Sequence, residues 1–432
     1  MRKILLLLIA VIMLNNFLCA EFDINGEIKF SEMWYIFHPH WQLASDNFHL
    51  LDIYGINESE DETTKLKVRF QIRMKDNDLT NKIMCYEIIP WEVWVQFRDL
   101  FIDNLKLKIG KQYFEWGTAD GIHPSSVLTP DDYSNPLSIG EKIPIIAFNV
   151  NYFYKSIKLY LIWIPQFIPA KMPEEFPLMS KSGFTMQEVS VVGFNSISNK
   201  PDIDYKGNGK AIKLKFSLLN VDFSTGYFEG YDYLPQVRSV VYSLSGTNQF
   251  KVTTEMFYPY MKVYTFDWTT SVQGIGFWGE IGIYKYDEIK TEIISPTGTD
   301  YIKIISKKPY ANYITGIDYN FESGFYLNLQ YSYGLPFVRG KDYLEDYIIL
   351  SLKDTFFDEY VEIESRNILG FNRKYNFKEN YEIMLNQSIS ILPLDDLKLT
   401  FALNEIDTKG EKMLLKEWKE YDSLSIEIKY SF

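Results

Sequence analysis

The sequence predicts an all-β protein whose antiparallel strands close into a transmembrane barrel of about 18 strands, with a range of roughly 16 to 20. Three observations favour this fold class. Many long segments alternate between apolar and polar residues, the connections between them alternate between short and long, and the stretch 423–432 is one strictly alternating strand. A period of two residues is the period of a β-strand.

Residues 1–20 have the features of a signal peptide. Two basic residues precede the unbroken apolar run Ile4–Leu14, and Ala20 ends a plausible cleavage site. The run is too short for a transmembrane helix, which needs about 20 residues. Cys19 leaves lipid attachment open as an alternative, which the bulky residue just before it disfavours. We expect export by the signal peptide and a mature chain that starts at Glu21.

The rest of the chain offers no stretch that could form a transmembrane helix. The longest apolar patches, 143–154 and 159–170, are interrupted by Asn, Pro or Gln. Only helices and closed barrels satisfy every backbone polar group in lipid. Any insertion into a membrane is therefore expected to use a barrel.

The composition agrees with a barrel. Aromatic residues make up 17% of the chain, with 32 Tyr and 31 Phe, and barrels carry aromatic girdles at both membrane interfaces. A soluble carbohydrate-binding β protein would also be rich in aromatic residues, so this observation supports the barrel without excluding that class.

Charge and cysteine content exclude other classes. Removing the signal peptide takes two of the 44 basic residues and leaves 42 against 57 acidic ones, a net charge of −15. No basic stripe or tail is present, so we expect no nucleic-acid partner. Cleavage also removes Cys19 and leaves Cys85 alone, so neither an intramolecular disulfide nor a cysteine metal site is expected.

Alternation is clearest in the segments 325–333 and 397–403, in which the odd-numbered positions are apolar. One face of such a strand suits lipid and the other suits a wet lumen. A soluble sandwich also alternates, but it does not explain so many long strands with no linker. The candidate strands are 22–36, 48–57, 64–75, 88–99, 104–114, 144–154, 157–167, 210–219, 221–229, 236–245, 249–257, 261–270, 273–285, 309–321, 324–334, 346–354, 360–371, 379–391, 396–405 and 423–432.

The connections support one barrel domain over 21–432. Short turns include 103–104 and 155–156, and the segment 48–57 is weak enough to be a loop instead of a strand. Barrels of this kind have short periplasmic turns and long external loops. The external loops are expected near 115–143, 168–209, 286–308 and 406–422.

The final strand has an apolar face that includes Tyr430 and Phe432. It resembles the closing strand of bacterial outer-membrane β-barrels. In that class the terminal aromatic residue is read by the barrel-assembly machinery. The resemblance therefore implies that Tyr430 and Phe432 form the membrane insertion signal, and that outer-membrane lipid surrounds the protein.

A second resemblance covers most of the mature chain. The motifs Gly110-Lys111-Gln112, Trp116-Gly117 and Asp132–Pro136 resemble the Gly-Arg/Lys-Gln, Trp-Gly and Asn-Pro signature of an uncharacterised family of porin-like outer-membrane barrels. The stretches 163–169 and 326–336 fit the same family. The chain departs from it in Lys111, where Arg is common, and in the insertion 170–209. The resemblance implies a fold and a location in the cell outer membrane, not a substrate.

The loop 116–141 is the stretch that we expect to carry function. Its prolines restrict the chain and its glycines permit tight bends, so a rigid loop folded into the lumen would narrow a pore. Gln112 and Trp116 form its root. An ordinary external loop and a specific ligand or Ca²⁺ site remain alternatives. The candidate constriction residues, in which acids would face lysines across the pore, are Lys106, Lys108, Lys111, Asp120, Asp131, Asp132 and Asn135.

These features favour a porin-like channel for the passive diffusion of small hydrophilic solutes. The alternative is a surface-displayed binding or adhesion barrel without transport, which the insertion 170–209 motivates. No enzyme is expected, because His123 beside Ser125 lacks the flanking sequence of a nucleophile elbow. The pair His38 and His40 is a weak metal signal, so no metal, no cofactor and no catalytic residue are expected. The solute and the oligomeric state are left open.

Overall fold

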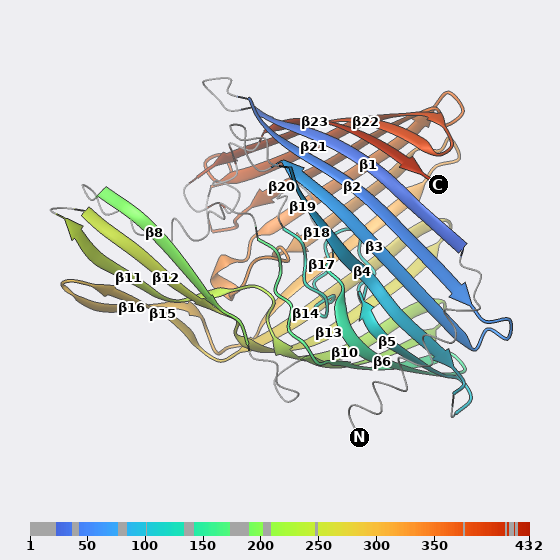
Figure 1. The fold of residues 1–432 in the computed structure, drawn as a ribbon, viewed down its shortest axis with the longest axis horizontal. Coiled ribbons are helices and arrows are strands. Elements are labelled where there is room, and N and C mark those ends of the chain that lie inside the picture. Colours follow the sequence, from blue (N-terminus) through green and yellow to red (C-terminus); the bar gives the residue numbers. More distant parts are fainter. Residues whose placement is uncertain are drawn as a thin grey trace.

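The computed structural model describes residues 23–36, 43–76, 84–100, 102–133, 142–172, 190–201, 209–246, 249–374, 376–410, 413, 419 and 422–432. The predicted signal peptide 1–20 lies outside these residues. The described chain is almost entirely β-structure, and its strands curve round a common axis (Figure 1). The helical element among the described residues is one short 3-10 turn, Lys341–Tyr343. No helix in this part of the chain is long and apolar enough to cross a membrane.

The main sheet is a closed antiparallel barrel of 18 strands among the described residues. The number expected from the sequence is confirmed. The barrel strands are β1 (Asp23–Ile36), β2 (Leu43–Glu58), β3 (Thr64–Asp76), β4 (Met84–Arg98), β5 (Leu105–Gln112), β6 (Ile145–Tyr154), β7 (Ile157–Ile164), β9 (Gly209–Leu218), β10 (Val221–Tyr231), β13 (Tyr260–Val272), β14 (Ile275–Tyr286), β17 (Tyr310–Asn320), β18 (Tyr326–Tyr333), β19 (Asp346–Phe356), β20 (Val361–Phe371), β21 (Tyr381–Leu394), β22 (Leu397–Lys409) and β23 (Ser423–Ser431).

The barrel closes where β1 meets β23. The two strands pair antiparallel from Glu27 opposite Ser431 to Tyr35 opposite Ser423. Beyond the strand end, Gly26 and Phe432 exchange two backbone hydrogen bonds of 2.8 and 2.9 Å. Closure leaves no strand edge with unpaired backbone groups. The terminal aromatic residue therefore lies within the seam of the barrel.

The connections differ between the two rims. The rim at which β1 begins carries short turns, such as 155–156, 219–220 and 273–274, and the opposite rim carries longer connections, such as 113–144 and 165–208. Two of the short turns have left-handed backbone at both central residues, with φ of 53° and 63° at 219–220 and 53° and 83° at 273–274. This backbone matches the twist of a β-hairpin.

A second, five-stranded sheet projects beyond the rim with the long connections, at the left of Figure 1. Its order is β16, β15, β11, β12 and β8, and the pairings of β11 with β15 and of β12 with β8 are parallel. Its strands are β8 (Ser190–Asn199), β11 (Gln236–Gly246), β12 (Gln249–Phe257), β15 (Ile289–Ser295) and β16 (Gly298–Ile305).

The second sheet corrects several details of the strand prediction. The segments 236–245 and 249–257 are strands as expected, but they leave the barrel. The ranges 168–209 and 286–308 contain β8, β15 and β16, although a loop was expected in each. Alternation of side chains shows that a segment is a strand, but it does not show which sheet the strand joins. Segment 48–57 is a full barrel strand, so the doubt about it was wrong.

The two faces of the barrel differ sharply. Large apolar side chains remain exposed on the outer face; among them are Phe70, Leu161, Phe266, Ile317, Leu329, Ile363, Ile389 and Phe401. The inner face is largely polar and includes buried Asp52, Gln71, Asn149, Thr265, Asn328 and Asn404. An apolar cluster also lies inside the barrel, where side chains of the connection 113–144 pack against the wall; it includes Trp116, Leu128, Ile145, Phe228, Val263 and Ile314.

We predict that the barrel folds without the β11–β12 hairpin. Deleting residues 236–257 preserves the pairing of β10 with β13, because these strands pair directly up to Tyr231 opposite Tyr260. The shortened protein should keep the mobility shift between unboiled and boiled samples in an SDS gel that marks a folded barrel. If the full-length protein shifts and the shortened one does not, the second sheet is part of the barrel's folding unit.

Candidate functional site

The segment 113–133, here called the inner loop, leaves β5 and folds into the barrel. It contacts the inner faces of β9, β14 and β18 through hydrogen bonds that are described below. Its two arms lie side by side at the root, because the Phe114 N–H bonds to the Thr129 hydroxyl at 3.0 Å and the Trp116 N–H bonds to the Ser126 hydroxyl at 3.4 Å. The loop therefore forms a compact hairpin inside the lumen.

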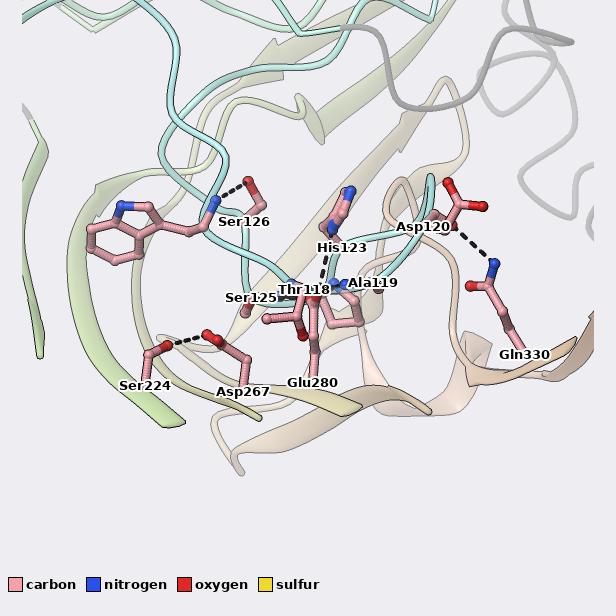
Figure 2. A network of polar contacts seen from close by, with 12 residues as sticks. Thr118, Ala119, Asp120, His123, Ser125, Ser126, Ser224, Asp267, Glu280 and Gln330 are labelled. Carbon is pink, nitrogen blue, oxygen red and sulfur yellow. Dashed lines mark hydrogen bonds and ion pairs between the residues drawn. The ribbon is translucent and has the colours of Figure 1, made fainter. Parts of the chain in front are cut away.

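Glu280 of β14 is the main anchor of the inner loop (Figure 2). Its carboxylate accepts hydrogen bonds from the backbone N–H groups of Thr118 and Ala119. It also accepts the Ser125 hydroxyl at 2.8 Å and lies 3.2 Å from Nδ1 of His123. The side chain of Glu280 is fully buried, and a buried carboxylate needs such partners. One acidic residue of the wall thus fixes the tip of the loop.

Two glycines permit this close approach. A Cβ atom on Gly117 would collide with the carboxylate of Glu280, and a Cβ atom on Gly282 would collide with the carbonyl oxygen of Pro124. The same carbonyl accepts the Tyr284 hydroxyl at 2.8 Å. Glycine inside a strand often marks a place where another backbone comes near, and here that backbone belongs to the inner loop.

Lys213 of β9 forms a second anchor. Its ammonium group donates to the carbonyl of Trp116 and pairs with Asp267 at 2.9 Å. Ser224 donates its hydroxyl to the same Asp267 (Figure 2). A Cβ atom on Gly226 would lie 3.2 Å from the Trp116 ring, so glycine leaves room for the indole against the wall. Trp116, predicted as a root of the loop, is therefore buried between the loop and the wall.

The two adjacent aspartates of the inner loop are engaged in ion pairs. Asp131 pairs with Lys142 at 2.5 Å and accepts the Tyr133 hydroxyl at 2.9 Å. Burial, together with the charge of Asp131, raises the pKa of Tyr133 well above its usual value, so the phenol stays protonated. Asp132 lies 3.6 Å from Arg73 and 3.5 Å from Lys171. These two carboxylates hold the loop and the neighbouring connection together.

Asp120 is the predicted acid that stays half-exposed, at the tip of the loop. Its carboxylate lies 3.5 Å from Arg366 of β20, and its carbonyl accepts the Gln330 amide at 3.1 Å. A cavity of about 110 Å³ lies between the tip and the wall. Its lining consists of Asp120, Gly121 and Ile122 from the loop and Ile349, Glu364, Arg366, Ile368, Met384 and Asn386 from the wall. The cavity carries charges of both signs.

A buried ion pair ties down the base of the second sheet. Arg339, in the connection before β19, binds Asp232 at 2.6 and 3.1 Å, and Tyr286 donates its hydroxyl to the same carboxylate at 2.7 Å. Burial lowers the pKa of Arg339, but the charge of Asp232 outweighs it and raises that pKa well above its usual value. Arg339 therefore stays charged and holds two long connections together.

Lys106 and Lys108 of β5 were expected to face the acids of the inner loop, but in the described part of the chain they contact aromatic rings instead. Lys106 and Lys108 lie on the inner face, where Lys106 is 5.0 Å from the Phe153 ring and Lys108 is 3.9 Å from the Trp94 ring. The ammonium group of Lys111 donates to the carbonyl of Pro90 and lies 5.9 Å from the centre of the Trp91 ring. The ion-pair partners described above for Asp120, Asp131 and Asp132 come from other elements. The physical reason is that the inner loop crosses the lumen and reaches distant strands.

The other predicted residues are placed as follows. Gln112 is buried at the root of the loop and donates to the carbonyl of Ala147 at 3.1 Å. Tyr430 and Phe432 are exposed, with stacked rings 6.4 Å apart. Asn135 lies outside the described residues. Tyr430 and Phe432 thus lie apart from the inner loop.

Sequence reasoning missed Glu280, Lys213 and Arg366. A usable signal existed for the first of these, because Glu280 and Gly282 share the polar face of one alternating strand. An acid beside a glycine on that face indicates a close approach by another segment. Nothing comparable singles out Lys213 or Arg366, whose partners are far away in the sequence.

Ser125 and His123 are not hydrogen-bonded to each other as a nucleophile and its base would be. Ser125 is fully buried and donates its hydroxyl to Glu280, not to His123, so it is not placed as a nucleophile. Within the described residues, no three His, Cys, Asp or Glu side chains are grouped to hold a metal ion. The pair His38 and His40 lies outside those residues.

The protein resembles known proteins in its fold and not in its sequence. No family model matches the sequence, and no curated protein matches it. Among solved structures, the chain is similar to a triple mutant of the Rhodopseudomonas blastica porin, at 8% identity with a TM-score of 0.41, over 95% of this chain and 100% of that one. It is also similar to OccK11 (OpdR) of Pseudomonas aeruginosa, at 9% identity with a TM-score of 0.49, over 95% of each chain. Neither similarity identifies a solute for this chain.

We predict that Glu280→Ala releases the inner loop. The substitution leaves buried N–H groups without their acceptor, which should lower the free energy of unfolding by about 2 to 4 kcal/mol. Urea titration of the purified protein in detergent measures this change, and proteolysis within 113–133 reports the release. Glu322→Ala, in an exposed short turn, is the matched control and should change stability by less than about 0.5 kcal/mol. Equal effects of the two substitutions would refute the anchor.

Proposed function

We propose that the protein is an outer-membrane channel for the passive diffusion of small hydrophilic solutes, and that the inner loop is its constriction. The observation that carries the proposal is a closed barrel with an exposed apolar outer face, a polar inner face and an irregular loop held inside it. Each of these features has a physical reason in a channel.

The outer face suits a bilayer. Exposed side chains such as Phe70, Phe266 and Ile389 would form an unfavourable surface in water. Monomeric soluble proteins rarely expose large contiguous apolar patches, whereas lipid requires an apolar surface round the whole barrel. Lipid also requires that every backbone N–H and C=O group be hydrogen-bonded within the protein. Pairing of β1 with β23 meets this requirement, because it leaves no strand edge in the hydrocarbon region.

The inner face suits a water-filled path. A ring of 16 to 18 strands is too wide for strand side chains to fill, and barrels of that size leave an aqueous channel. The inner loop occupies part of this space and stays fixed through Glu280 and Lys213. Solutes would then pass beside the loop, where Asp120 and Arg366 face the cavity of about 110 Å³.

A second candidate function is surface binding without transport. The second sheet favours it, since β8, β11, β12, β15 and β16 project beyond the barrel rim (Figure 1). Exposed apolar side chains on this sheet include Leu244 and Tyr301. Conductance separates the two functions, because a display barrel has no need of an open lumen.

We predict that the protein forms discrete channels in planar bilayers and that deleting residues 118–125 raises their conductance. The deletion removes the tip of the inner loop and joins Gly117 to Ser126. The join is short, because Trp116 and Ser126 are hydrogen-bonded. Single-channel recording in KCl measures the conductance, and the SDS-gel shift shows that the variant is folded. A folded wild-type barrel with no conductance would favour the display function.

We further predict opposite changes in ion selectivity for Asp120→Asn and Arg366→Gln. Loss of the carboxylate should lower the preference for cations, and loss of the guanidinium should raise it. The reversal potential in a KCl gradient measures both changes. They should be larger at low salt, because the Debye length is about 10 Å at 0.1 M and longer below that. Asp103→Asn, in an exposed turn, is the control. Identical reversal potentials in all variants would place the conducting path elsewhere.

A further inference from the structure

Cross-strand register shows which side chains share the inner face of β5, β6, β7 and β9. Lys213 faces inward, because it donates to the Trp116 carbonyl of the inner loop. Lys213 is the register partner of Tyr160, and Tyr160 is the partner of Asn151. Asn151 in turn is opposite Lys106. Residues directly opposite each other lie on the same face of a sheet, so all four side chains point to the lumen.

Four lysines lie on this part of the inner wall. Lys108 is two residues after Lys106, Lys158 is two residues before Tyr160, and Lys215 is two residues after Lys213. A shift of two residues keeps a side chain on the same face of a strand. Lys106, Lys108, Lys158 and Lys215 are here called the lysine arc. They lie toward the rim that carries the short turns, on β5, β7 and β9.

The lysine arc brings like charges together. Lys158 is directly opposite Lys215, and Lys106 is directly opposite Arg98. Like charges in direct cross-strand pairs destabilise a sheet. Arg98 has a carboxylate partner in Glu62, at 3.3 Å. The lysines of the arc need some other negatively charged or electron-rich group nearby to offset their mutual repulsion.

No carboxylate in the described part of the chain forms an ion pair with a lysine of the arc. The contrast with neighbouring cations of the same wall is clear, since Lys67 binds Glu92 at 2.6 Å and Arg69 binds Asp52 at 2.6 Å. Lys106 and Lys108 instead lie over the faces of aromatic rings, at 5.0 and 3.9 Å from the ring centres. Aromatic faces hold the ammonium groups in place without a carboxylate paired to them.

Two amides complete the surroundings. Asn149 lies opposite Lys108, and Asn151 lies opposite Lys106. The side-chain oxygens of both are buried and lack a hydrogen-bond partner among the described residues, and Asn149 is only 7% exposed. These oxygens are acceptors and do not bind an anion, but the NH₂ group at the other branch of each amide is a donor that a bound oxyanion can use. Ammonium groups next to amide donors form a set of partners for an oxyanion.

We propose that the lysine arc and these two amides bind a small solute that bears a carboxylate or phosphate group. This inference rests on the proposed channel function only for the route by which the solute arrives. The anion supplies the negative charge that the wall lacks, and it accepts hydrogen bonds from lysine and asparagine side chains. The channel thus handles anionic solutes at a defined place on one side of its lumen, although the whole chain is acidic, with a net charge of −13.

Binding is tested on the folded full-length protein in detergent, at constant ionic strength. Isothermal titration with inorganic phosphate, and separately with acetate, measures the dissociation constant for each type of anion. The double variant Lys106→Gln/Lys108→Gln should weaken binding by about tenfold or more, since a hydrogen bond to a charged group contributes about that much. Lys210→Gln is the matched control, because Lys210 is exposed on the opposite face of β9 from buried Ala211 and Lys213, and it should leave the dissociation constant unchanged.

The outcomes separate this inference from the proposed function. A wild-type protein that conducts ions but binds neither phosphate nor acetate overturns the inference and leaves the channel standing. A protein that binds either anion at the arc without conducting supports the inference and refutes the channel. If the first double variant loses the SDS-gel shift of a folded barrel, Lys158→Gln/Lys215→Gln replaces it. Unchanged binding in a folded variant overturns the inference.

Discussion

Closure of the sheet is the constraint on which the rest of the structure depends. The pairing of β1 with β23 gives each barrel strand two neighbours and leaves no open edge. Once the ring is closed, alternation sends every second side chain into the lumen, so the polar residues of each strand meet in one enclosed space. With 18 strands this space is too wide for those side chains to fill. The inner loop and its apolar partners, such as Leu128 and Phe228, occupy part of it.

A loop inside a barrel carries backbone groups that cannot all pair with one another, so the wall has to supply partners. Glu280 accepts hydrogen bonds from backbone N–H groups of the inner loop, whereas Lys213 and Gln330 donate hydrogen bonds to carbonyl oxygens of the loop. Tyr284 and Tyr233 donate their hydroxyls to two further carbonyls. The polar inner face therefore has two roles, since some of its residues hold the loop and the others remain available to water and solute.

The sequence predicts the strands well because alternation is a local property. Segments such as 325–333 repeat the pattern within a few residues, and each of the 20 candidate segments overlaps a strand of the structure. Alternation does not identify the sheet that a strand joins, which is why 236–245 and 249–257 were placed in the barrel. The site is harder to predict, because its contacts join distant positions. Thr118 and Glu280 are 162 residues apart, and Asp131 and Asp132 pair with Lys142 of a connection and with Arg73 of β3.

Net charge is a poor guide to the field inside this barrel. Several acids of the inner wall are already paired, for example Asp52 with Arg69, Glu92 with Lys67 and Asp267 with Lys213. In the proposed channel, the charge that a solute would meet is the charge left after this pairing, and the wall of β5, β7 and β9 keeps an excess of lysine. Interactions with solvent-exposed charges more than a Debye length away, about 8 Å at physiological salt, are largely screened. An acidic protein can therefore present a basic inner wall, and the sign of selectivity in the proposed channel would depend on which side chains stay unpaired.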